Sequence, residues 1–110
     1  MEHKAPDTQA IISALSSVTP YKIILFGSHA QGRATDESDL DLIVVLNEEH
    51  PFQSFRERME TTARIRTLLR PFSLQYGLDL LVFTLSEWET VRKTENTFWQ
   101  EIRNTGVEVV

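Results

Sequence analysis

The stretch Leu-Asp-Leu-Ile-Val-Val-Leu at residues 40–46 is the feature that most restricts how this chain can fold. Its apolar and β-branched residues predict a strand. The near-continuous apolar run after Asp41 indicates that this strand is buried on both faces. Such a strand needs neighbouring strands at its edges and helices over both faces of the sheet. Two further apolar runs, at 21–26 and 78–84, are predicted to be strands as well.

The segments around the first strands predict a helix, a loop and a short final strand. Asp7 is a suitable N-cap for a helix over residues 8–18, and Pro20 ends that helix. Residues 28–38 are polar and contain a glycine, which is typical of a loop or of a short helix followed by a loop. Residues 107–110 are apolar enough to form a short strand at the end.

The longest predicted helix begins near Pro51, because proline fits the first turn of a helix. Its predicted apolar stripe comprises Phe52, Phe55, Met59, Ala63, Leu68, Leu69 and Phe72. Arginines cover much of the remaining surface of this helix, and we interpret them as a solvated face. Gly77 breaks the helical pattern before the third strand.

The last helix has a predicted capping box, in which Ser86 and Glu89 have the spacing for reciprocal side-chain bonds to the backbone. Trp88 and Phe98 suit the core side of this helix, and Trp99 is expected to be partly exposed. The order of the elements predicts an α+β fold, an α/β sandwich in which a small mixed β-sheet is flanked by helices.

Length and charge restrict the organisation and the class of protein. A chain of 110 residues has the size of one domain, so we expect a single domain over residues 1–110. The net charge of -5 argues against a general nucleic-acid-binding protein, because contacts to phosphates need clustered Lys and Arg. The same charge is compatible with a nucleotide that is held through a metal ion, since a bound cation inverts the local field.

The chain contains no Cys, which excludes disulfides, Cys-based zinc sites and thiol catalysis and fits a reducing compartment. Residues 1–4 lack the apolar segment of a signal peptide. No apolar run approaches the roughly 20 residues that are needed to cross a bilayer. We therefore expect a cytoplasmic protein.

The pair Gly27-Ser28 follows the first predicted strand directly. A glycine at the end of a buried strand allows a sharp turn and a close approach of a ligand to the backbone. If a short helix follows, its free N–H groups would face an anion, and the Ser28 hydroxyl could donate to a phosphate oxygen. Taken alone, this pair is more often an ordinary turn.

Two acidic residues, Asp39 and Asp41, stand at the beginning of the central apolar strand. Side chains at i and i+2 of a strand point to the same face, so these carboxylates repel each other and lose solvation. A divalent cation relieves both costs, and Mg²⁺ prefers one or two carboxylates together with substrate phosphates. A solvated strand end with Asp39 as a local cap is the alternative. The buried strand that follows favours a site.

Asp79 lies in an apolar run near the start of the third strand. An unpaired buried carboxylate is costly, so this residue has either a salt bridge with an arginine or a functional partner. If the third strand neighbours the second, Asp79 completes a cluster of three carboxylates. Such a cluster can bind two metal ions that clamp a phosphoryl or nucleotidyl transfer.

The segment Gly27-Ser-His-Ala-Gln-Gly-Arg-Ala-Thr-Asp-Glu-Ser-Asp39-Leu-Asp41 has the spacing Gly-Ser, ten residues, Asp-x-Asp. It resembles the signature of nucleotidyltransferases of the DNA polymerase β type. The fit extends to Ala30, Gly32 and Ser38. The order of the predicted elements is similar to the minimal catalytic core of that family, so the resemblance covers most of the chain. His29 stands where relatives often carry Arg or another polar residue, and we assign it no catalytic role.

The resemblance implies roles for the matching residues. Its catalytic and metal-binding positions fall on Asp39, Asp41 and Asp79. Gly27 and Ser28 would hold the triphosphate of ATP, and the carboxylates would bind Mg²⁺, with two ions expected. Asp79 would help to bind the second ion and activate the attacking hydroxyl, which would attack the α-phosphorus and release pyrophosphate. Asp79 matches by its place in the pattern and not by a tight motif.

The loop arginine Arg33 could reach a phosphate of the nucleotide. An exposed loop arginine without that role is equally plausible.

The acceptor of the transferred group is expected on another molecule. Larger members of the family carry an additional domain that binds the acceptor, and 110 residues leave no room for one. The chain is therefore similar to the stand-alone minimal nucleotidyltransferases, which are encoded with a helical HEPN protein as toxin–antitoxin pairs. That resemblance implies an antitoxin that transfers AMP from ATP to a tyrosine hydroxyl of a HEPN-family toxin, with no direct binding to nucleic acid or membrane.

Two other functions stay open at this point. The chain could be a non-catalytic nucleotide-binding or scaffolding partner of a HEPN protein, although scaffolding does not require a carboxylate cluster. It could also be a small-molecule nucleotidyltransferase of the antibiotic-modifying type that acts as an oligomer. An exposed strand at 107–110 could pair with another chain and form a homo-oligomer.

Overall fold

The computed structural model describes residues 6–35 and 38–110. The expectation that residues 1–4 do not form a signal peptide falls outside the described residues. Two positions of the predicted loop over 28–38 also lie outside them. The described strands form one sheet in the order β3-β2-β1-β4. Their bounds are Pro20–Phe26 for β1, Leu40–Leu46 for β2, Leu78–Phe83 for β3 and Val107–Glu108 for β4. Because β2 pairs antiparallel with β1 and parallel with β3, the predicted mixed sheet is confirmed.

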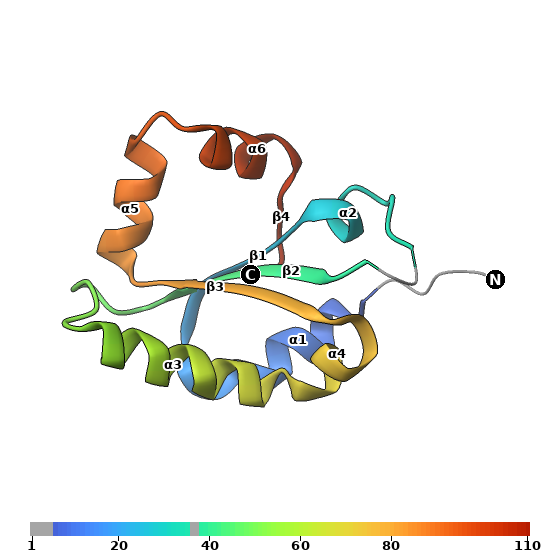
Figure 1. Ribbon diagram of the computed structural model, residues 1–110, viewed down its shortest axis with the longest axis horizontal. Helices are drawn as coiled ribbons and strands as arrows, with labels where there is room; N and C mark the ends of the chain where they lie inside the picture. Colours follow the sequence, from blue (N-terminus) through green and yellow to red (C-terminus); the bar gives the residue numbers. More distant parts are fainter. Residues whose placement is uncertain (1–5, 36–37) are drawn as a thin grey trace.

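Helices cover both faces of this sheet (Figure 1). One face carries α1 (Thr8–Ala14), α3 (Phe55–Leu68) and α4 (Arg70–Tyr76), and the other carries α5 (Leu85–Lys93) and α6 (Thr97–Thr105). The short helix α2 (Gly27–Ala30) continues directly from β1. The predicted α+β class is thus confirmed. Among the described residues, no helix combines the length and the apolar character that crossing a bilayer would require.

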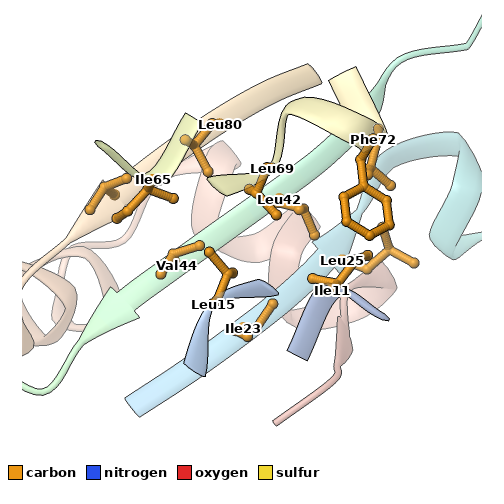
Figure 2. Close-up of a cluster of buried hydrophobic side chains, with 12 residues drawn as sticks. Ile11, Leu15, Ile23, Leu25, Leu42, Val44, Ile65, Leu69, Phe72 and Leu80 are labelled. Atoms are coloured by element: carbon orange, nitrogen blue, oxygen red, sulfur yellow. The ribbon is translucent and has the colours of Figure 1, made fainter. Parts of the chain in front are cut away.

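The central strand β2 separates two apolar clusters, as its composition predicts. Leu42 and Val44 point into the larger cluster, which lies between the sheet and the helices α1, α3 and α4 (Figure 2). Ile43 and Val45 point into the smaller cluster, which also contains Trp88 and Ile102. All four of these β2 side chains are buried completely. Alternation along a strand therefore places apolar residues on both faces of the sheet.

The first helix is shorter than predicted. Asp7 is its N-cap, as expected, and its side chain accepts a hydrogen bond from the backbone N–H of Ala10 at 3.2 Å. The helix ends at Ala14, and a 3-10 turn, η1 (Ser16–Val18), replaces its predicted last turn. Thr19 then adopts a left-handed conformation with φ of 46°, which turns the chain into β1.

The prediction that Pro51 begins the long helix is wrong. The N-cap is Ser54, whose hydroxyl accepts a hydrogen bond from the N–H of Glu57 at 3.0 Å. Phe55 and Met59 of the predicted stripe point to solvent and are 76% and 53% exposed, because the face of α3 that packs on the sheet carries the buried residue Ile65 instead.

The long helix is also divided in two, because α4 begins directly after Leu69. Pro71 lies in the first turn of α4 and has no N–H to continue the hydrogen bonds of α3. Leu69 and Phe72 nevertheless belong to the larger cluster, as predicted.

The predicted capping box of Ser86 and Glu89 is wrong by two residues. The cap is Thr84, whose hydroxyl accepts from the N–H of Glu87 at 3.4 Å. In return, the Glu87 carboxylate accepts from the N–H of Thr84 at 3.1 Å. Strand β3 ends one residue earlier than predicted, at Phe83, so the helix also starts earlier.

The last predicted helix is broken between α5 and α6, where Asn96 caps α6 by accepting from the N–H of Trp99 at 2.7 Å. The break changes the helical phase of the residues that follow. Phe98 is therefore 37% exposed and not part of the core, whereas Trp99 packs edge-to-face on Trp88 with ring centroids 5.5 Å apart. Trp88 itself is buried, as predicted.

Candidate active site

Two carboxylates stand side by side where β2 and β3 begin. Asp41 of β2 and Asp79 of β3 are register partners on neighbouring parallel strands, and the Asp79 carboxylate lies close enough to raise the pKa of Asp41. Asp39 precedes β2 by one residue, and its charge acts on Asp41. The structure thus brings together all three carboxylates that the sequence predicts as site residues.

Strand β1 brings Gly27 to the same place. Phe26 is the register partner of Asp41 on the other side of β2, and Gly27 and Ser28 follow it as the first residues of α2. Gly27 has a positive φ of 72°, and a Cβ at this position would overlap Oδ2 of Asp41. Both the backbone conformation and the close carboxylate therefore require glycine here.

A second glycine supports Asp39 in the same way. Gly77 has a φ of 75°, and a Cβ there would overlap Oδ1 of Asp39. Its carbonyl also accepts a hydrogen bond from the N–H of Leu40 at 3.1 Å, which joins the starts of β2 and β3. Sequence reasoning treats Gly77 only as a helix end and misses this role. The sequence signal for this role was the position of Gly77 directly before the strand that carries Asp79.

His29 joins the two ends of the loop between α2 and β2. Its Nε2 lies 3.3 Å from the carbonyl oxygen of Ser38, directly before Asp39, and its ring packs edge-to-face on Tyr76 with centroids 5.3 Å apart. His29 therefore ties the loop to α4. These contacts hold the two halves of the Gly-Ser and Asp-x-Asp motif next to each other.

The loop arginine Arg33 is exposed. Its N–H donates to the carbonyl of Ser28 at 2.9 Å, and its guanidinium donates to the side chain of Gln31. The side chain of Ser28 is half-buried at the start of α2. A phosphate role for Arg33 stays a prediction.

The three carboxylates concentrate negative charge at this edge of the sheet. The pKa of Asp41 is raised from its ordinary 3.8 to about 6, first by burial and then by the neighbouring charges of Asp79 and Asp39 and by hydrogen bonding to Asp79. No Lys or Arg in the described part of the chain forms an ion pair with any of the three. Asp39 and Asp79 are exposed, so a ligand can reach the cluster from solvent.

The donor set fits a hard divalent cation such as Mg²⁺. It consists only of carboxylate oxygens, and the repulsion that raises the pKa of Asp41 is what a bound cation would remove. Within residues 6–35 and 38–110, no group of three or more acidic, His or Cys side chains already has the spacing of metal ligands. The fit therefore rests on donor chemistry and charge.

Known proteins are similar to this chain in sequence and in fold. The family described as "Polymerase beta, Nucleotidyltransferase" matches residues 9–109. A Methanocaldococcus jannaschii protein with the provisional name protein adenylyltransferase is 30% identical over 88 residues, which are 80% of this chain and 77% of the relative.

Two solved structures have the same fold. A toxin–antitoxin complex with AMP-PNP has a TM-score of 0.59 and 21% identity, covering 96% of this chain and 73% of the other. A variant of the toxin–antitoxin pair MntA–HpeT has a TM-score of 0.60 and 19% identity, with the same coverage of 96% and 73%.

Proposed function

This chain belongs to the polymerase β-type nucleotidyltransferase family, and from that membership we propose that it is a Mg²⁺-dependent protein adenylyltransferase. Its substrate is ATP, and its acceptor is a tyrosine hydroxyl of a HEPN-family toxin in a separate chain. The observation that carries the proposal is the pairing of Asp41 with Asp79, with Gly27 in contact with Asp41. An interaction module has no need for this costly arrangement of charge.

In the proposed reaction, the acceptor hydroxyl oxygen forms a bond to the α-phosphorus of ATP. The bond from that phosphorus to the bridging oxygen of the β-phosphate breaks, and pyrophosphate leaves. Asp79 accepts the proton of the hydroxyl. Gly27 and Ser28 hold the triphosphate through the backbone N–H groups at the start of α2 and the Ser28 hydroxyl, which can donate to phosphate oxygens.

Mg²⁺ would be held by Asp39, Asp41 and Asp79, with two ions proposed. When bound, it neutralises charge on the phosphate oxygens and on the carboxylates. Arg33 is exposed near Ser28 and supplies a cation to the triphosphate. The domain that carries these groups extends over residues 1–110 and works in the cytoplasm, where ATP and a protein partner are available.

Support for the acceptor and the nucleotide comes from the relatives. The M. jannaschii relative is named as a protein adenylyltransferase. The similar structures are toxin–antitoxin complexes, and one of them contains AMP-PNP, an ATP analogue. The proposed HEPN identity of the partner is supported by the resemblance of this chain to minimal nucleotidyltransferases.

A transfer assay tests the proposal. The protein is incubated with α-phosphate-labelled ATP, Mg²⁺ and the product of the adjacent gene, and mass spectrometry locates the AMP. We expect label on a tyrosine of the partner, no label with Asp41→Asn, and normal labelling with Glu49→Gln, which changes an exposed carboxylate outside the site. A stable complex without transfer, unaffected by Asp41→Asn, would contradict the enzyme and favour a scaffold. Label on an aminoglycoside instead of the partner would contradict the protein acceptor.

A further inference from the structure

A cavity of about 350 Å³ is lined by residues of α5, α6, β1 and β4. Figure 1 shows that α5 and α6 lie on the same face of the sheet. The cavity is separate from the candidate active site, because none of the five motif and carboxylate residues lines it. Its volume is in the range of sites that bind small molecules. Its polar and aromatic walls are formed by Tyr21, Lys22, Trp88, Arg92, Trp99 and Arg103.

The walls of this cavity are positive in a chain whose net charge is -5. Three cationic side chains line it, and Glu108 is the single acidic one among its lining residues. Lys22 is paired with Glu108 at 2.7 Å, and Arg92 with Glu89 at 2.6 Å. Arg103 has no ion pair within the described part of the chain and is exposed, so its guanidinium can meet an incoming anion.

The other walls are aromatic. Trp99 is half-buried, and its indole packs edge-to-face against that of Trp88. Trp88 is 2% exposed, and its Nε1–H has no hydrogen-bond acceptor among the described residues. An indole face offers an apolar surface on which a planar ring can pack.

We propose that this cavity binds a small organic anion that carries a planar ring. The anionic group pairs with Arg103, which can donate two parallel hydrogen bonds to a phosphate or a carboxylate. The ring packs against Trp99. The positive wall excludes cations, and the cavity does not depend on the proposed transfer of AMP.

Intrinsic fluorescence reports on this cavity directly, because both tryptophans of the chain line it. The full chain is titrated in EDTA with four probes: AMP, benzoate, adenosine and inorganic phosphate. We expect a saturable change in tryptophan fluorescence with AMP, benzoate or both, and this result identifies the anionic group as phosphate or carboxylate. Adenosine lacks the charge and inorganic phosphate lacks the ring, so both should bind about tenfold more weakly or worse.

Three variants locate the binding. Arg103→Gln should weaken binding of the responding anion about tenfold or more, since it removes a charged hydrogen bond. Arg64→Gln, an exposed arginine of α3 outside the cavity, is the matched control and should bind like the wild type. Asp41→Asn should also bind like the wild type, because it alters only the candidate active site. Circular dichroism checks that Arg103→Gln is folded.

The proposal is overturned if neither anion gives a saturable change at millimolar concentration, or if adenosine or inorganic phosphate binds as tightly as the responding anion. It is also overturned if folded Arg103→Gln binds like the wild type. Loss of binding in Asp41→Asn but not in Arg103→Gln would place the anion at the carboxylate site instead. None of these outcomes bears on AMP transfer, so the two proposals fail independently.

Discussion

Gly27 and Asp41 are in such close contact that position 27 has no room for a side chain, because a Cβ there would overlap Oδ2 of Asp41. Gly27 directly follows β1, and Asp41 lies near the start of the neighbouring strand β2, so the register pair of Phe26 with Asp41 brings the two residues together. The glycine and the carboxylate of the motif are therefore one packed unit. This explains in physical terms why the motif needs both.

Replacement of Gly27 by Ala should impair catalysis more than folding. The positive φ costs roughly 1–3 kcal/mol of stability for a non-glycine residue, and the new Cβ must move the Asp41 carboxylate. A displacement of about 1 Å in a catalytic group can cost on the order of 10²-fold in rate. Labelled AMP transfer and urea denaturation measure the two effects.

Gly32→Ala is the matched control for this prediction. Gly32 has nearly the same φ of 69°, but a Cβ there would meet nothing within 4 Å. Gly32→Ala should therefore lose similar stability and keep most of its activity. Equal loss of activity in the two variants would show that backbone strain, and not the contact with Asp41, is the cause.

Replacement of Asp79 by Asn should change both the charge and the chemistry of the site. It removes the neighbouring charge and one side-chain hydrogen bond that raise the pKa of Asp41, so that pKa should fall below about 6. AMP transfer should fall about 10²–10⁴-fold, the usual contribution of a general base. NMR titration of the Asp41 carboxyl and the transfer assay measure these changes. An unchanged transfer rate would remove Asp79 from the catalytic residues.

Stability without metal should fall as pH rises from about 4 to about 6. Asp41 has a pKa of about 6 when folded, against an ordinary value of 3.8, so the folded protein binds this proton more tightly than the unfolded chain. Its contribution to stability is thus fully present below the ordinary pKa, is lost through this window, and is constant above it. Thermal melts in EDTA across this range measure the effect, and Asp41→Asn should remove it.

Mg²⁺ should reverse this trend. A proton and a cation compete for the Asp41 carboxylate, so the stabilisation by Mg²⁺ should be small below the pKa of about 6 and should increase above it. Melting temperatures with and without Mg²⁺ at each pH give the difference. A constant difference at all pH values would show that Asp41 does not bind the ion.

Thr84→Ala should destabilise the protein more than Ser86→Ala. Thr84 is buried and caps α5 through the N–H of Glu87, so its loss should cost about 1 kcal/mol, with a range of roughly 0.5–2. Ser86, the cap that sequence spacing predicts, lies inside α5, and its change should stay within about 0.5 kcal/mol. Urea denaturation of both variants decides between the two caps.

Sequence patterns predicted the strands better than the helix boundaries. The central strand was predicted over the residues that form β2, because an apolar run with acidic residues only at its start is a local signal. Helix starts depended on competition between nearby caps. The long helix begins after Ser54 and not at Pro51, and α5 begins after Thr84 and not at Ser86. In both cases the side chain of the actual cap accepts a hydrogen bond from a free N–H group of the first turn.

The sequence by itself determined the α+β class and the Gly-Ser to Asp-x-Asp motif, because both depend on residue types at short, fixed spacings. Only the tertiary structure decided that Asp79 lies beside Asp41, since this contact requires β3 to pair with β2 in parallel and in one particular register. The tertiary structure also decided that Gly77 leaves room for the Asp39 carboxylate. Asp79 is far from Asp41 along the chain, and it raises the pKa of Asp41 only because packing places the two carboxylates side by side.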